Sequence, residues 1–198
     1  MLNDTLKNHH IILASGSPRR QQFFKDLDLD FEIRLKPVKE DYPNHLTHYE
    51  ITNYLAQLKA FPFKSELQEK DILITSDTIV WHDNKALGKP RDADDAFNIL
   101  KSLSDTTHEV ITSVCFTTKT SEKILYDITK VTFKKLTDAE INYYIKTAKP
   151  FDKAGAYGIQ EWLGLTAVTK LEGSYFNVMG LPTHLVYKTL NTLSEKVL

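Results

Sequence analysis

The chain has 198 residues, enough to bury the core of one large α/β domain or of two small lobes without disulfides. Its 25 Lys and Arg against 26 Asp and Glu give a formal net charge of −1. This balance argues against non-specific attraction to nucleic acid or to an anionic membrane. A polyanionic ligand would therefore have to be met by a local cluster of cations.

Cysteine usage and hydropathy indicate a cytoplasmic protein. The single cysteine, Cys115, cannot form an internal disulfide, and its apolar neighbours are typical of a buried small side chain. The first ten residues lack an apolar stretch of signal-peptide length, and no apolar run approaches the ~20 residues that span a bilayer. We therefore expect a cytoplasmic chain that binds neither a membrane nor nucleic acid.

Buried strands alternate with capped helices over the first 80 residues. Apolar and β-branched runs predict strands over 11–14, 30–38 and 71–80. Ser17 followed by proline predicts a helix start, and this helix should extend to about Leu27. Thr47 and Glu50 have the spacing of a capping box, which predicts a helix that ends near Pro62.

Turn signals, a hairpin and further helices organise the rest of the chain. Asp83 and Asn84 predict a turn, and Asp92 begins a predicted helix that runs to Leu103. The other predictions are an antiparallel hairpin over 109–118 and 123–136, a capped helix from Thr137 to about Lys146, a glycine-containing loop, a strand near 165–171 and a helix after Pro182.

These elements predict an α/β fold with a long mixed β-sheet flanked by helices. Strands separated by helices favour parallel pairing, whereas the hairpin requires antiparallel pairing in the same sheet. Internal repeats, low-complexity tracts and linkers are absent from the sequence. We therefore expect a single domain over 1–198, with two lobes around a nucleotide cleft.

The segment ASGSPRR, residues 14–20, resembles a phosphate cradle. Ser15 follows a strand, and Arg19 and Arg20 lie in the first turn of the next helix. Free backbone amides, the positive end of the helix dipole and two guanidinium groups would all favour a polyanion there. Two arginines oppose that dipole unless an anion is present, although a solvated helix start is an equally good interpretation of this segment alone.

Asp77 and Thr78 in the segment TSDT combine a carboxylate with a predicted strand end. Ligands of open α/β sheets bind outside the carboxyl ends of strands, where we expect Asp77 to lie. Such a carboxylate can hold a divalent cation, activate a water molecule, or do both. The alternative is an Asp that hydrogen-bonds its own turn, which is the commoner arrangement for an isolated tetrapeptide.

Three further charged side chains could contribute to a phosphate site. Lys59 borders the apolar face of its predicted helix, so it either extends to solvent or reaches into a site. Lys89 precedes a proline and should therefore have extended backbone from which its ammonium can project. Glu40 follows a predicted strand. Solvated surface positions are the alternative for all three.

Gln160 ends the segment DKAGAYGIQ, residues 152–160. Gly155 and Gly158 permit a close approach of the backbone to a ligand, and the Gln160 amide offers a donor and an acceptor side by side. Such an amide can pair with the edge of a nucleobase. Alternatively, it satisfies local backbone groups.

Taken together, these segments resemble the Maf family of septum-formation-inhibitor-like proteins and nucleoside triphosphate pyrophosphatases. The similar strings span nearly the whole chain. They are LASGSPRR at 13–20, Glu40, the Lys59 helix, SDT at 76–78, GKPRD at 88–92, LSDTTHEVITSV at 103–114, DKAGAYGIQ at 152–160 and EGSYFNVMGLP at 172–182.

The resemblance implies an ITPase-like fold and a role for each site residue. It places Asp77 as proton acceptor, Gln160 as a specificity residue, and Arg19 and Thr78 among the specificity positions. It assigns phosphate and metal handling to Ser15, Arg19, Arg20, Glu40, Lys59 and Lys89. The string AYGIQ is similar to that of the subgroup acting on dTTP and UTP, whereas a sister subgroup acts on 7-methyl-GTP. Lys39, where members often have a second acid, and TSDT in place of GADT are departures.

The resulting hypothesis is a metal-dependent pyrophosphatase. Asp77, with Glu40, would bind Mg²⁺, Mn²⁺ or Co²⁺, and Asp77 would also accept a proton from water. The segment GxxxxGK[ST] is absent from the sequence, which excludes a P-loop. Alternatives are a 7-methyl-GTP pyrophosphatase, a house-cleaning enzyme for modified pyrimidine nucleotides, and a non-catalytic nucleotide-binding regulator of cell division. Oligomeric state is left open, with a homodimer among the options.

Overall fold

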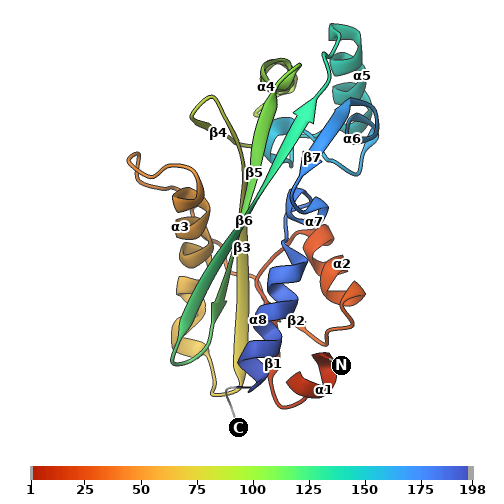
Figure 1. The fold of residues 1–198 in the computed structure, drawn as a ribbon. Helices are drawn as coiled ribbons and strands as arrows, with labels where there is room; N and C mark the ends of the chain where they lie inside the picture. The colour runs from red at the N-terminus through yellow and green to blue at the C-terminus, as the bar shows by residue number, and fades with distance from the viewer. Residues whose placement is uncertain (1, 196–198) are drawn as a thin grey trace. The chain divides into compact units, whose positions relative to one another are not determined.

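The computed structural model describes residues 2–195 and has a mixed sheet flanked by helices, as predicted (Figure 1). The strands are β1 (His10–Leu13), β2 (Glu32–Ile33), β3 (Asp71–His82), β4 (Lys85–Leu87), β5 (Thr107–Thr117), β6 (Glu122–Phe133) and β7 (Val168–Glu172). The α-helices are α1 (Leu2–Leu6), α2 (Pro18–Asp26), α3 (Tyr49–Ala60), α4 (Ala93–Leu103), α5 (Asp138–Ala148), α6 (Trp162–Ala167), α7 (Tyr175–Val178) and α8 (Thr183–Glu195). Two 3₁₀ helices are η1 (Phe61–Glu66) and η2 (Ala154–Ala156).

The sheet combines parallel and antiparallel pairing. Its strand order is β2-β1-β3-β5-β6-β7, and β4 pairs with β3 off this path. Strand β1 is parallel to both β2 and β3, whereas β3 with β4 and β6 with β7 are antiparallel. Asp83 and Asn84 form the predicted turn between β3 and β4, and both have positive φ angles. Strands β5 and β6 are consecutive neighbours in the sheet and correspond to the hairpin predicted over 109–118 and 123–136.

The chain forms two compact units, each assembled from separate segments. Of the described residues, the first unit contains 2–77, 112–126 and 180–195, and the second contains 78–111 and 127–179. Strands β3, β5 and β6 each contribute residues to both units.

In the first unit, α3 packs on one side of the strands, whereas α2 and α8 lie on the other (Figure 1). The α3 side buries Ala56 and Ala60 of the helix against Ile12, Leu73 and Cys115 of three neighbouring strands. Burial raises the pKa of the Cys115 thiol to about 11, so this cysteine is an inert core residue, as its apolar neighbours predicted.

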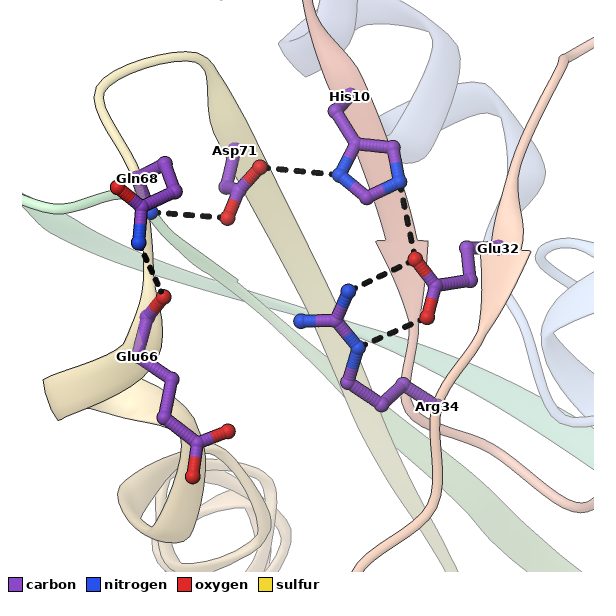
Figure 2. Close-up of polar contacts among 6 residues, drawn as sticks. All are labelled: His10, Glu32, Arg34, Glu66, Gln68 and Asp71. Carbon is purple, nitrogen blue, oxygen red and sulfur yellow. Dashed lines mark hydrogen bonds and ion pairs between the residues drawn. The ribbon is translucent and has the colours of Figure 1, made fainter.

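A polar network joins the beginnings of β1 and β3 to β2 (Figure 2). The His10 ring contacts Asp71 Oδ1 at 3.0 Å through Nδ1 and Glu32 Oε2 at 3.1 Å through Nε2. Arg34 donates two hydrogen bonds to the same Glu32 carboxylate. Asp71 also accepts from the Gln68 backbone N–H at 2.9 Å. These contacts fix the pairing of the three strands at the end of β1 away from Ser15.

The second unit has a core in which α4, α5 and the 154–163 segment pack together around the aromatic side chain of Tyr144. His108 lies inside this core with 1% of its surface exposed, in edge contact with the Phe133 and Tyr157 rings. Its Nε2 is 2.8 Å from the Tyr157 hydroxyl. Burial lowers the pKa of His108 to about 3, with the charge of His82 adding a smaller effect.

Acidification from pH 7 to pH 5 should therefore destabilise the fold through His108. A histidine with a depressed folded pKa stabilises the native state above the unfolded pKa near 6.5, and this stabilisation is lost as pH falls toward 3. Over this pH window we expect the free energy of unfolding to fall by about 2 kcal/mol, because only the unfolded chain binds the proton. Urea unfolding at both pH values tests this. His108→Gln should remove most of the pH dependence, and an equal dependence in the variant would contradict the assignment.

Besides β3, which extends past the predicted 71–80 to His82, two strands differ from those predicted. The strand predicted over 30–38 is wrong beyond Glu32–Ile33, because β1, with which it pairs, offers a short pairing edge of four residues. The strand predicted near 165–171 starts too early. Residues 162–167 form helix α6, since Leu163 and Ala167 lie four apart and are both completely buried.

The helix termini follow the capping predictions with one exception. Thr137 and Glu140 form the complete capping box of α5, and Asp92 accepts from the Asp95 N–H. At α3 the box is only half formed. Glu50 accepts from Thr47, but the N-cap position is His48, which makes no side-chain capping bond. The short helices α1, α6 and α7 were not predicted.

Candidate active site

Asp77 lies within β3 rather than at its end, so the predicted strand-end position is wrong. The reason is that β3 continues past its pairing with β1, which stops at Leu13 and Ile74, and goes on to pair with β4. Asp77 therefore lies beyond the carboxyl end of the parallel neighbour β1. Ligands of open α/β sheets bind outside the carboxyl ends of parallel strands. Asp77 lies beyond such an end of β1, but not of β3. Only 6% of its surface is exposed.

Lys59 links two carboxylates, those of Asp77 and Glu40. It lies in the last turn of α3, and its Nζ is 2.6 Å from Asp77 Oδ1 and 3.1 Å from Glu40 Oε1. The Lys59 side chain is largely buried, whereas that of Glu40 is half exposed. The Lys59 ammonium thus contacts one carboxylate from the sheet, that of Asp77, and one from the loop that precedes α3, that of Glu40.

The protonation of Asp77 depends on opposing effects. Burial raises the pKa of its carboxyl, and the negative charge of Glu40 acts in the same direction. The hydrogen bond and positive charge of Lys59, with the charge of Arg20, act against them. The pKa is raised overall, so Asp77 is a stronger base than an exposed aspartate, which suits a group that takes a proton from water.

Arg20 is held by backbone carbonyls beside the carboxylate. Its Nε donates to the Gly180 carbonyl at 2.7 Å, and its Nη1 donates to the Ser76 carbonyl at 2.9 Å. The second bond reaches the residue immediately before Asp77. Arg20 therefore fixes the start of α2 to β3 and places a positive charge near Asp77.

The rest of the 14–20 segment has the predicted cap geometry. The Ser17 hydroxyl accepts from the Arg20 N–H as the N-cap of α2, and the Ser17 N–H donates to Ser15 Oγ at 3.3 Å. Gln21 donates to the Ser15 carbonyl at 3.1 Å. Arg19 is half-buried in the same first turn. Of the predicted site residues in the first unit, Lys59, Glu40 and Arg20 thus act on Asp77, whereas Ser15 and Arg19 lie in the segment that leads into α2.

The other predicted site residues belong to the second unit. Thr78 follows Asp77 in β3, Lys89 is exposed between β4 and α4, and Gln160 is exposed just before α6. The Gly155 N–H donates to the Gly88 carbonyl at 3.1 Å, which ties the loop of Gln160 to the loop of Lys89. Gly155 has φ +69°, and an added Cβ would lie 2.6 Å from Val80 Cγ2. Its glycine is therefore required for this close approach.

Similarity to known proteins identifies the family. The family model described as Maf-like protein matches residues 10–193. The chain belongs to the Maf family. It is 69% identical to the dTTP/UTP pyrophosphatase of Flavobacterium johnsoniae, over 98% of this chain and 100% of that protein. It is 44% identical to the dTTP/UTP pyrophosphatase of Porphyromonas gingivalis W83, over 97% and 98% of the two chains.

A solved structure supports the fold of this Maf protein. The Ham1 protein of Staphylococcus aureus superposes with a TM-score of 0.53 at 13% identity, and the match covers 93% of this chain and 99% of that one. At such low identity the match concerns the fold alone, and it agrees with the predicted α/β fold built on a mixed sheet flanked by helices.

Some parts of the Maf site carry no local sequence signal. Gly180 and Ser76 act through their carbonyls, and Gly180 is 160 positions away from Arg20, so no spacing rule connects them. Gln21 follows the two arginines but was not singled out. A general rule could have indicated it, since the first turn of a helix leaves polar side chains near the preceding loop.

A cavity elsewhere in this Maf chain does not coincide with the predicted site. It has a volume of about 590 Å³, and its lining comes from residues 6–7, 9–11 and 29–32, beside the network of Figure 2. This lining contains none of the residues gathered around Asp77.

Proposed function

We propose that this Maf protein hydrolyses dTTP and UTP to the nucleoside monophosphate and pyrophosphate. The two relatives described above carry that activity in their names and align with almost the whole chain. The geometric observation that carries the proposal is the buried Asp77 carboxylate, which shares the Lys59 ammonium with Glu40 and lies near Arg20. Polyphosphate hydrolysis needs this combination of a base with several cations.

Asp77 is assigned the proton-acceptor role. Cleavage between the α- and β-phosphates requires a water molecule to lose a proton as it attacks, and a carboxylate whose pKa is raised by burial can accept that proton. Lys59 orients the Asp77 carboxylate through their 2.6 Å contact. We assign the neutralisation of phosphate charge to Lys59, Arg19, Arg20 and Lys89, with Ser15 offering a hydroxyl beside the start of α2.

A divalent cation fits the same pair of carboxylates. Asp77 and Glu40 already converge on one cationic group, and oxygen ligands suit Mg²⁺, which proteins often hold through one or two carboxylates together with substrate phosphates. Among residues 2–195, no group of three or more His, Cys, Asp or Glu is arranged to hold a metal. The bound ion would supply charge neutralisation at the phosphates. We propose Mg²⁺, Mn²⁺ or Co²⁺ as that ion.

Gln160 is assigned to base recognition, together with Thr78 and Arg19. Uracil and thymine present the same carbonyl–NH–carbonyl edge, which an amide can pair with through its own acceptor and donor. The thymine methyl group changes only apolar contacts and therefore discriminates weakly. Cytosine presents a different edge, so we expect dTTP and UTP to be better substrates than CTP, with ATP and GTP poor.

Replacing Gln160 with alanine tests this assignment. We expect preference for UTP over CTP to fall by about 1–3 kcal/mol in kcat/KM, because a hydrogen bond to the base is lost. Chemistry that depends on Asp77 should remain measurable. The assay is pyrophosphate release from dTTP, UTP, CTP, GTP and 7-methyl-GTP by wild type and variant. If the variant ranks these triphosphates in the same order as the wild type, Gln160 has only a local structural role.

The same assay separates the rival functions. A wild-type preference for 7-methyl-GTP or GTP over UTP would favour the sister subgroup. Nucleotide binding without pyrophosphate release, in the presence of Mg²⁺, Mn²⁺ or Co²⁺, would favour a non-catalytic regulator. Extending the substrate panel to modified pyrimidine nucleotides tests the house-cleaning role.

The proposed hydrolysis of nucleoside triphosphates also suggests where the protein acts and what it binds. None of the helices within residues 2–195 is both long and apolar enough to cross a membrane. We propose a cytoplasmic location, where nucleoside triphosphates are available, with the triphosphate as the partner rather than nucleic acid or membrane. A homodimer is retained as a hypothesis, and sedimentation at assay concentration would test it.

A further inference from the structure

The loop that presents Gln160 is anchored by a chain of buried polar contacts. Glu161 Oε2 accepts a hydrogen bond from the Tyr144 hydroxyl, and Glu161 Oε1 lies 3.0 Å from Lys153 Nζ. The Tyr144 hydroxyl oxygen in turn accepts from the Gly158 N–H at 3.0 Å. Two positions of one loop, Gly158 and Glu161, are therefore joined to a single side chain of α5, and Lys153 is joined to Glu161.

Tyr144 and Lys153 are buried far more deeply than the partners of a surface ion pair, and the Glu161 side chain between them is 26% exposed. Tyr144 is completely buried, and 8% of the surface of Lys153 is exposed. Burial, followed by the hydrogen bond to Glu161, raises the pKa of the Tyr144 hydroxyl, so it stays protonated and remains a donor. Lys153 also pairs at 2.8 Å with Asp152, whose side chain is exposed. Such buried groups hold their geometry because breaking one contact leaves its partner unsatisfied.

The backbone of the loop is shaped around Glu161. An added Cβ at Gly158 would lie 2.8 Å from Glu161 Cδ, so the carboxylate occupies the space that any other side chain at 158 would need. The Glu161 N–H donates to the Gly158 carbonyl at 3.0 Å and closes a tight turn. Gln160 lies inside this turn, between the buried Ile159 and the anchored Glu161, and its own side chain is exposed.

We propose that Tyr144 and Glu161 are positioning residues that set base discrimination by holding Gln160 in place. This inference rests on the proposed function, because it acts through the amide assigned to read the base. The two residues do not touch the substrate in this scheme. They restrict the backbone on both sides of Gln160, so that its amide is presented in one orientation.

Tyr144→Phe is the direct test, because it removes one hydroxyl and keeps the ring in the core. We expect the ratio of kcat/KM for UTP to that for CTP to fall about tenfold, chiefly through a higher KM for UTP with kcat unchanged. Tyr143→Phe removes the hydroxyl of an adjacent tyrosine that is 51% exposed, and it should leave the ratio at the wild-type value.

A double-mutant cycle shows whether Tyr144 acts through Gln160. In a Gln160→Ala background, Tyr144→Phe should cause no further change in the UTP-to-CTP ratio, because the amide that it positions is absent. An equal fall in both backgrounds would overturn the inference. So would an unchanged ratio in Tyr144→Phe itself.

Glu161 provides a second route should Tyr144→Phe fail to fold. Glu161→Ala should reproduce the fall in the ratio, whereas Glu161→Gln, which keeps the shape and one acceptor, should restore most of it. An unchanged ratio in Glu161→Ala would overturn the inference. A wild type that prefers UTP but whose ratio survives these changes overturns the positioning role alone. A wild type that releases no pyrophosphate from UTP overturns the proposed function as well.

Discussion

Asp77→Asn should reduce kcat for pyrophosphate release from UTP by about 10²–10⁴-fold, the usual contribution of a positioned general base. The variant keeps the shape of the side chain but removes the proton acceptor and one negative charge from the Lys59 contact. Lys59 retains Glu40 as its partner, so its ammonium is not left alone. We therefore expect nucleotide binding to persist, and steady-state kinetics with a direct binding titration test both parts.

The same substitution should leave the unfolding temperature at pH 7 unchanged or higher. A carboxyl whose folded pKa is raised contributes stability below its unfolded pKa, and that stability is lost as pH rises through the folded pKa. Because its raised pKa makes ionisation of Asp77 costlier in the native state than in the unfolded chain, an asparagine, which does not ionise, removes that cost. Loss of turnover with retained stability would separate catalysis from folding.

Asp71→Asn is the matched control, since Asp71 is an equally buried aspartate at the start of the same strand. Its partners are His10 and Gln68 in the network of Figure 2, so the control should lose stability but keep the wild-type kcat of the folded enzyme. Near-normal turnover in Asp77→Asn would contradict the base assignment. Similar losses of turnover in the two variants would point to a general structural effect.

Local sequence signals predicted most of the sheet and the long helices because these elements bury a continuous apolar face. The cap at Ser17, the capping box at Thr137 and Glu140, and the turn at Asp83 and Asn84 are decided within a few residues. Strand lengths are decided by partners. The predicted 30–38 strand was too long because β1 offers pairing over only four residues, and β3 was longer than predicted because it pairs with β4.

In the candidate site, too, some features could be predicted from the sequence and others depend on the fold. Residue type and spacing, together with the family resemblance, indicated Asp77, Glu40 and Lys59, and the structure brings their charged groups into contact. The two contacts of Arg20 with distant carbonyls could not be predicted, because they depend on where the chain folds back. The anchoring of the Gln160 loop by Tyr144 could not be predicted either, because the sequence does not distinguish a tyrosine that anchors a loop from an ordinary core residue on a helix.

Removal of divalent cations should abolish turnover. A bound triphosphate would bring several negative charges next to Asp77 and Glu40, and the repulsion between like charges is strong when one of them is buried. In excess EDTA we expect pyrophosphate release to fall to background and to return when Mg²⁺, Mn²⁺ or Co²⁺ is added in excess of the chelator. The unfolding temperature in EDTA should not change, because the Lys59 ammonium contacts both carboxylates and offsets their charge. Glu40→Gln should raise the metal concentration needed for half-maximal activity, whereas no metal concentration should restore Asp77→Asn.

Full turnover in chelator, with no metal retained on the protein by elemental analysis, would remove the cation from the proposed chemistry and leave Lys59, Arg19 and Arg20 as the groups that neutralise the phosphates.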